Sequence, residues 1–473
     1  MRLAALAIPY GPAGADVQAL GPQALVDAGF LANPEAPAGA LRKGRALVRH
    51  GRYQEARALL APHARCADPT LGAEITELLG VAAIHLGGDW RQLLGGALAV
   101  FAKVGDAAGQ ARCHRQLGEA SLMAGEFEEA ATELRRAAAL CRAGGDTAGA
   151  AMADAVRARA TLRAGHIEVA LGQIDRALAE LLPLGRAREE GMARLDRARI
   201  LAFLGDATTS AKELISAERM LAGGGSQSDR LWARLTRAEA LLILGDTARA
   251  GAGLRRLLIE AVDTEELPTR AWLFTLLGRA VAAESPSEGR RHLMRGKHLY
   301  QQAGSTWGAA HCELALARVE HRLGFAVAGR LSALGSMPLS EWPMFAAELR
   351  TVRGEVTAER DPELARRLLL DARRFAVSSG NRSLARGIDR TLRRAELVAG
   401  DDLMPMENER TLPMVHGGVT VSAGWVPPGG PQAIDDDVVT EQDQVRAMRL
   451  IQHSVRLAML SGLTPPEAVG VRR

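Results

Sequence analysis

Residues 117–130 read LGEASLMAGEFEEA, and the two glycines of this stretch decide the fold. Gly118 and Gly125 stand in a segment that is otherwise typical of a helix, where each glycine costs about 1 kcal/mol relative to alanine. Such a cost indicates a close approach of another backbone or a turn. We therefore expect Gly118 to lie mid-helix against a partner helix. Gly125 is expected to end that helix in the left-handed conformation that glycine adopts readily.

The same pattern returns along the chain at a fixed spacing. Equivalent turns follow at Gly165, Gly205 and Gly245, each 40 residues after the last, and Ser285 continues the register. Further turns of this kind occur at Gly51, Gly87 and Gly324 and near Arg360. Apolar residues recur at helical spacing on both sides of each turn, so each unit is predicted to be a helical hairpin. About nine such units fill roughly residues 41–395.

Two of the turns, GRYQEA at residues 51–56 and GEFEEA at residues 125–130, resemble the tetratricopeptide repeat. That family follows Leu-Gly with Gly-x-aromatic-x-Glu-Ala and spaced alanines. The resemblance covers about three quarters of the chain and implies an all-α fold, a right-handed α-solenoid of about nine hairpins. Units of 40 residues resemble the long-helix repeats of large bacterial signalling and regulatory proteins. In a solenoid we expect each unit to bury its apolar face only against its neighbours in sequence.

Four segments are predicted from these boundaries: an irregular N-terminal segment (1–40), the solenoid (41–398), an acidic arm rich in proline and glycine (399–439), and a C-terminal amphipathic helix with a tail (440–473). The stretch 401–446 holds nine acids and two arginines, a net charge of −7, which leaves +11 for the rest of a chain whose net charge is +4. One apolar stripe is expected along the last helix, made by Val445, Met448, Ile451, Val455 and Met459. We expect the arm and this helix to dock onto the solenoid of the same chain or of a second copy, the latter giving self-association.

Composition narrows the class of protein. No window approaches 18 consecutive apolar residues, so no membrane span is predicted, and the opening MRLAALAIPYGPAGAD is a poor secretory signal, which favours a cytoplasmic protein. The four cysteines lie far apart, so neither a disulfide framework nor a zinc site is predicted. No basic run with interleaved aromatic residues occurs, which makes nucleic acid an unfavoured partner.

The segments of the sequence that come nearest to catalytic motifs each lack a required feature. GRRHLMRGKH at residues 289–298 has six residues rather than four between its glycines and no apolar strand before it, so it is not a phosphate-binding loop. Cys113 and His114, and likewise His311 and Cys312, are sequence neighbours whose side chains diverge on a helix. We therefore predict no enzyme, no catalytic residue, no metal site and no cofactor.

The resemblance implies that the first helix of each hairpin lines a concave groove. One column of equivalent positions along these helices is rich in arginine: Arg159, Arg199, Arg279 and Arg318. A second column holds Met152, Met192, Trp232, Trp272 and His311, which makes the two tryptophans neighbours in space. The arginines are expected to bind a partner, although pairing with glutamates of the same groove is an open alternative. The tryptophans could equally cap the core.

These observations predict a non-catalytic scaffold or adaptor that binds a peptide or protein in the concave groove. Arginine forks match carboxylates, which favours an acidic partner. Two alternatives stay open at this point. The chain could be a sensor or adaptor fragment of a bacterial transcriptional regulator, or the regulatory subunit of a protease or defence system.

Overall fold

The computed structural model describes residues 36–261 and 264–398, and every regular element in this part of the chain is a helix. The helices are α2 (Pro37–Arg49), α3 (Tyr53–Leu60), α4 (Pro69–Leu86), α5 (Trp90–Val104), α6 (Ala107–Ala124), α7 (Phe127–Ala143), α8 (Thr147–Arg163), α9 (Ile167–Leu181), α10 (Ala187–Phe203), α11 (Ala207–Gly224), α12 (Gln227–Leu244), α13 (Thr247–Glu260), α14 (Leu267–Val281), α15 (Pro286–Gln302), α16 (Thr306–Arg322), α17 (Ala328–Gly335), α18 (Pro343–Thr357), α19 (Pro362–Ser378) and α20 (Arg382–Arg394). Short 3-10 turns follow α3 (Ala61–His63) and α9 (Leu182–Leu184).

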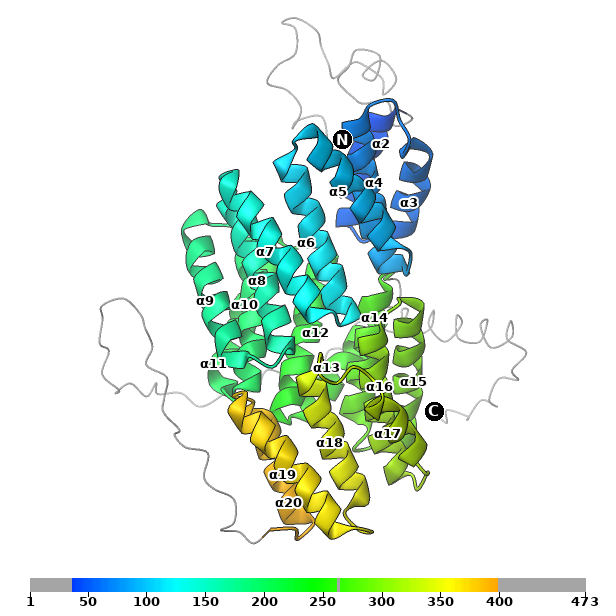
Figure 1. Ribbon diagram of the computed structural model, residues 1–473, viewed down its shortest axis with the longest axis vertical. Helices are drawn as coiled ribbons and strands as arrows, with labels where there is room; N and C mark the ends of the chain where they lie inside the picture. Colours follow the sequence, from blue (N-terminus) through cyan, green and yellow to red (C-terminus); the bar gives the residue numbers. More distant parts are fainter. Residues whose placement is uncertain (1–35, 262–263, 399–473) are drawn as a thin grey trace, which may run out of the picture. The chain divides into compact units, whose positions relative to one another are not determined.

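Consecutive helices pair into antiparallel hairpins, from α2 with α3 to α18 with α19, and α20 packs on α19 (Figure 1). The described residues thus contain the nine predicted units and one further helix, and the all-α solenoid is confirmed. The solenoid was predicted to start at residue 41, but the first of these helices begins earlier, at Pro37. The acidic arm and the C-terminal helix, with Val445, Met448, Ile451, Val455 and Met459, lie outside the described residues.

The two glycines of the opening stretch have the roles predicted for them. A Cβ atom on Gly118 would lie 2.5 Å from Cγ of Leu134 on α7, so only glycine allows this approach of the two helices of the hairpin. Gly125 has a φ of 95° and ends α6 in the left-handed conformation. Ala130 is fully buried at the start of the second helix. These contacts build the helical hairpin that the sequence predicts.

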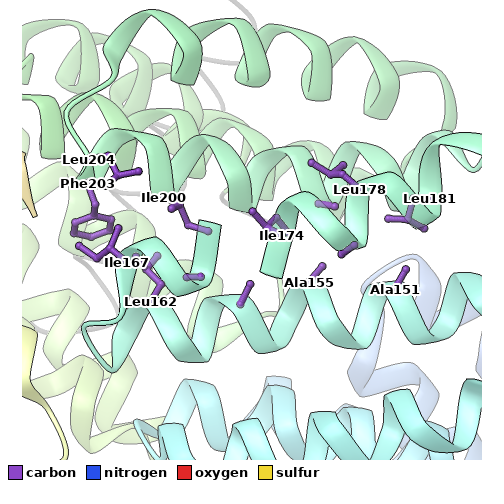
Figure 2. Packing of buried hydrophobic residues seen from close by; sticks show 14 of the residues in the cluster. Ala151, Ala155, Leu162, Ile167, Ile174, Leu178, Leu181, Ile200, Phe203 and Leu204 are labelled. Carbon is purple, nitrogen blue, oxygen red and sulfur yellow. The ribbon is translucent and has the colours of Figure 1, made fainter. Parts of the chain in front are cut away.

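Neighbouring hairpins share one hydrophobic core. One cluster of fully buried side chains joins three consecutive helices. It contains Leu162 of α8, Ile174 and Leu181 of α9, and Ile200 of α10. Figure 2 shows these side chains gathered between the three helices. Fully burying a side chain of this size contributes about 1.5–3 kcal/mol, so packing between hairpins supplies much of the stability of each unit.

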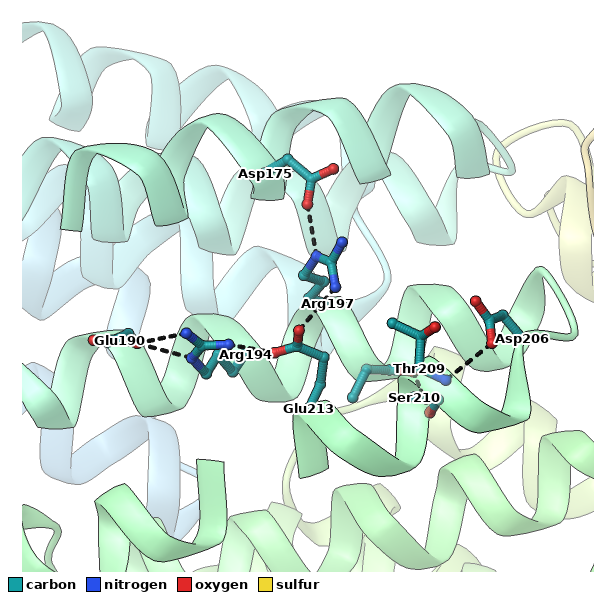
Figure 3. Close-up of polar contacts among 9 residues, drawn as sticks. Asp175, Glu190, Arg194, Arg197, Asp206, Thr209, Ser210 and Glu213 are labelled. Atoms are coloured by element: carbon teal, nitrogen blue, oxygen red, sulfur yellow. Dashed lines mark hydrogen bonds and ion pairs between the residues drawn. The ribbon is translucent and has the colours of Figure 1, made fainter. Parts of the chain in front are cut away.

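Polar contacts complete the joints between hairpins. Arg197 of α10 binds Asp175 of α9 at 2.7 Å and Glu213 of α11 at 2.8 Å (Figure 3). At the start of α11, the Asp206 side chain accepts a hydrogen bond from the backbone N–H of Thr209. That bond satisfies one of the donors left free at a helix N-terminus.

Distant hairpins also touch, and this corrects the expectation that each unit contacts only its neighbours. The contacts join α4 to α14, α6 to α16, and both α10 and α12 to α20. We call this interface the seam. Its hydrogen bonds include those from Tyr53 Oη to Glu266 (3.3 Å), Ser305 Oγ to Met123 O (2.6 Å), Trp342 Nε1 to Gly125 O (2.8 Å) and Ser383 Oγ to Ala202 O (2.7 Å). Turns of early hairpins therefore pack on the helix starts of late ones.

Within residues 36–261 and 264–398, no helix is both long enough and apolar enough to cross a bilayer.

Candidate functional site

A cavity of about 420 Å³ lies among the first helices of several hairpins, and we call it the inner cavity. Its walls come from both sides of the seam, since α4, α6 and α8 contribute together with α12, α14 and α16. Four of the six tryptophans of the chain line it: Trp90, Trp232, Trp272 and Trp307. Ligand pockets commonly have volumes of about 300–1,000 Å³ and largely apolar walls with a few polar groups. The inner cavity has both properties.

Trp232 and Trp272 are neighbours, as their register predicted, with ring centroids 4.7 Å apart and a tilt of 52°. The guanidinium carbon of Arg199 lies 5.5 Å from the Trp272 ring, and that of Arg159 lies 5.5 Å from the Trp232 ring. Cations attract the faces of indole rings at such distances. The predicted tryptophans and two of the predicted arginines thus meet in one place.

Arg199 is held by the chain itself. Its side chain is buried and donates to Glu239 at 2.6 Å, to Asp196 at 2.8 Å and to Thr236 at 3.0 Å. Burial alone would raise the pKa of Glu239, but Arg199 and Arg163 overcome this and lower it to about 2. This is the paired arrangement that the sequence left open as the alternative to partner binding.

Arg159 differs from Arg199. Its Nε lies 3.1 Å from Asp196 as an ion pair, and no hydrogen bond joins its guanidinium to another described residue. The Asp196 carboxylate is shared, because it also accepts from Arg199. The side chain of Arg159 is 16% exposed and lines the inner cavity. Its terminal nitrogens are therefore available as donors to an occupant.

Sequence reasoning missed several wall residues. Arg163 follows Arg159 by one helical turn, binds Glu239 at 3.0 Å and lies 5.0 Å from the Trp307 ring. That spacing of four residues was a usable signal for a shared face. Trp90 and Tyr300 carried no such signal, because they reach the cavity from hairpins that meet only through the winding of the solenoid.

The other predicted residues lie outside the cavity wall. Arg279 is exposed, and Arg318 binds Glu355 at 2.7 Å. Met152 and Met192 are half-buried and pack against hydrophobic clusters. His311 lies 4.3 Å from the Trp307 ring and 4.9 Å from Phe345, between ring centroids. Burial lowers the pKa of His311 to about 3.

The adjacent cysteine and histidine pairs diverge, as predicted. His114 hydrogen bonds to Glu133 at 2.6 Å, whereas Cys113 is buried in a hydrophobic cluster. Cys312 contacts Thr275 Oγ1 at 3.0 Å, on a different side of α16 from the rings around His311. Burial raises the pKa of Cys113 to about 12 and that of Cys312 to about 11, so both thiols are protonated at neutral pH. Among the described residues, no group of three His, Cys, Asp or Glu side chains is arranged to hold a metal ion.

A second hollow, of about 890 Å³, has an acidic wall. Its wall includes Glu126, Glu129, Glu168 and Glu341 and contains no tryptophan, arginine or lysine. An anionic group is repelled there, whereas the wall of the inner cavity holds four arginines (Arg91, Arg159, Arg163 and Arg199) and two glutamates (Glu126 and Glu266).

No protein-family model matches the sequence, and no curated protein matches it. Among solved structures, the chain is similar to a Rap protein complexed with the competence and sporulation factor, at 13% identity and a TM-score of 0.46, over 77% of this chain and 98% of that one. It is similar to the Rap conjugation gene regulator of the plasmid pLS20 in complex with the Phr* peptide, at 10% identity and a TM-score of 0.45, over 78% and 99% of the two chains. The apo form of the quorum sensor NprR from B. thuringiensis follows at 13% identity and a TM-score of 0.36, over 76% and 98%. By its own helices, the described part of this chain is an all-α array of helical hairpins.

Proposed function

We propose that this chain is a non-catalytic binding protein of the scaffold or adaptor class, which receives a peptide or an exposed protein segment in the inner cavity. The observation that carries the proposal is the gathering of Trp90, Trp232, Trp272 and Trp307 around one hollow. Tryptophan and arginine are the side chains that most often dominate binding energy at protein interfaces. A role in the core alone would not require the tryptophans to gather around one hollow, because scattered tryptophans can fill a core equally well.

The charge of the cavity wall favours an acidic partner. Arg159 and Arg163 contribute positive charge, and the terminal nitrogens of Arg159 donate to no described residue. Guanidinium groups bind carboxylates through two parallel hydrogen bonds, and such charge-assisted bonds are stronger than neutral ones. Asp196 and Glu239 offset part of this charge, so the cavity selects a local carboxylate rather than a long acidic run.

A sensor or adaptor role in transcriptional regulation is the second candidate, and the seam favours it. The walls of the inner cavity belong to hairpins on both sides of the seam, so an occupant contacts both at once. A ligand stabilises the arrangement that binds it in proportion to its differential affinity. Occupancy would therefore strengthen the seam. The protease or defence role stays a hypothesis.

The test is a block of the cavity in the full chain. Met123 lines the inner cavity, and Met123→Trp adds a ring there, whereas Met294→Trp adds the same ring at an exposed position on α15. Both variants and the wild type are incubated with a synthetic peptide library, and the retained peptides are identified by mass spectrometry. We expect retention by the wild type and by Met294→Trp, with a loss of at least about tenfold in Met123→Trp. Equal retention by all three proteins would place the binding site elsewhere.

A further inference from the structure

We infer that the group received by the inner cavity is an aromatic carboxylate, with the guanidinium of Arg159 as the anion-binding group. The inference rests on the proposed binding site and adds the chemistry of what enters it. Two features of the wall carry it: the indole rings and one guanidinium with unused donors.

The walls are suited to a flat ring. Trp232 and Trp272 stand as a tilted pair, and Tyr300 and Trp307 complete an aromatic lining. Aromatic rings associate in offset or edge-to-face arrangements, which add to the free energy of burial. A cavity of about 420 Å³ is at the lower end of the volumes typical of ligand pockets, so it holds a single ring system rather than a folded segment.

Arg159 is distinguished among the guanidiniums of the wall. Arg199 uses its donors on described residues, Arg163 donates to Glu239, and Arg91 pairs with Glu126 and Glu129. Within residues 36–261 and 264–398, Arg159 makes no hydrogen bond through its guanidinium, and its Nε is buried. Its Nε lies 3.1 Å from Asp196 as an ion pair, whereas its terminal nitrogens donate to no described residue, so a carboxylate in the cavity would supply acceptors for them.

The position of Arg159 fixes where a carboxylate would lie. Its guanidinium carbon is 5.5 Å from the Trp232 ring, which holds the group against one wall. The terminal nitrogens form a planar fork that matches the two oxygens of a carboxylate. A ring attached to that carboxylate would then lie beside the tryptophan pair.

The carboxylates of the same wall do not need a cationic ligand, because the chain itself supplies their partners. Glu266 accepts hydrogen bonds from Ser228 Oγ at 2.6 Å and from Thr269 Oγ1 at 2.5 Å. Glu126 pairs with Arg91. Both acids are thus satisfied by the chain. The buried side-chain nitrogens of this wall that lack a hydrogen-bond partner are Arg159 Nε and His85 Nδ1, and of these two groups Arg159 carries the positive charge that a carboxylate needs.

Two sources supply this chemistry: the C-terminal aromatic residue of a peptide, and a free aromatic acid. Calorimetry on the full chain distinguishes them with two matched pairs of probes. One pair is a peptide ending in phenylalanine with a free carboxylate and the same peptide as its C-terminal amide. The other is 2-naphthoate and 2-naphthamide. In the pair from the true source, the acid is expected to bind at least about tenfold more tightly than the amide, because only the acid makes charge-assisted bonds.

Three variants assign this preference to Arg159. We expect Arg159→Gln to abolish the difference between acid and amide, and Arg159→Lys to keep part of it by keeping the charge. Arg279→Gln, at the equivalent register position on α14 but exposed, should leave the difference unchanged. Circular dichroism melting of each variant checks that it folds. If Arg159→Gln does not fold, Arg159→Lys still tests whether the preference depends on Arg159.

The outcomes separate this inference from the proposed function. An acid preference that survives in Arg159→Gln overturns the inference, as does equal binding of acid and amide in both pairs by the wild type. If neither acid binds while library peptides are still retained in a way that Met123→Trp abolishes, the inference fails and the proposed function stands. If an acid binds through Arg159 while no library peptide is retained, the inference stands and the peptide-binding function fails.

Discussion

At the scale of single residues, the buried charges around Arg199 make a strong prediction. Arg199→Met leaves Asp196 and Glu239 buried with fewer partners, and breaking such a buried network costs about 3–5 kcal/mol. Urea denaturation measures this loss. The matched control is Arg279→Met, at an exposed position, where we expect a change within about 0.5 kcal/mol. Equal stability of the two variants would show that the network contributes nothing.

His311 predicts a pH dependence of stability. Burial among aromatic rings, with repulsion from Arg163 and Arg279, lowers its pKa to about 3 from the ordinary 6.5. Between these values the unfolded chain binds a proton that the folded chain does not, so the free energy of unfolding falls as the pH decreases. The slope from one such histidine is roughly 1.4 kcal/mol per pH unit below about pH 6.5.

The measurement is the urea unfolding free energy at about pH 7 and about pH 5.5, for the wild type and for His311→Gln. We expect the variant to lose less stability than the wild type over this interval. His50→Gln, at an exposed histidine, should follow the wild type. An identical pH dependence in wild type and His311→Gln would contradict the assignment.

At the scale of helices, two glycines should respond to the same substitution with opposite signs. Gly118→Ala puts a methyl group 2.5 Å from Leu134 Cγ and should destabilise the chain by about 1–3 kcal/mol, the usual cost of overpacking. Gly96→Ala, on the exposed face of α5, has no atom within 4 Å of the new methyl group and should stabilise by about 0.5–1 kcal/mol through helix propensity. Melting temperatures that shift in the same direction would disprove the packing role of Gly118.

The helices and hairpins could be predicted from the sequence because their signals are local. A 40-residue spacing of turn glycines located the hairpins, and the same register brought Trp232 to Trp272. The pairing of Arg199 with Glu239 was also within reach, since the two residues stand 40 positions apart in one column. Local signals could not decide between this pairing and partner binding, because that choice depends on side-chain distances between hairpins.

At the scale of the whole described array, the seam is the feature that the sequence did not show. Its hydrogen bonds join residues 181 to 217 positions apart, such as Ser383 with Ala202 and Trp342 with Gly125. Such contacts follow from small rotations summed over several repeats, and no local pattern encodes that sum. The same winding brings Trp307 and Tyr300 to the inner cavity, which explains why these wall residues were missed.

The seam should couple distant hairpins. Trp342→Phe removes the donor to Gly125 O from a buried position, and leaving a buried carbonyl without that partner costs about 1–3 kcal/mol. We expect faster amide hydrogen exchange both in α18 and in the α6–α7 hairpin. Trp90→Phe is the control, because the Trp90 indole donates no hydrogen bond to another described residue. Faster exchange in α18 alone would mean that the seam transmits no stability.

Hydrogen exchange on the full chain, with and without the retained peptides, tests whether the inner cavity is the binding site. We expect added protection in the helices that line the cavity (α4, α5, α6, α8, α10, α12, α14, α15 and α16), and none in α9 and α11, which contribute no residue to its wall. Protection confined to α9 and α11, or no change at all with peptides bound, would contradict this expectation.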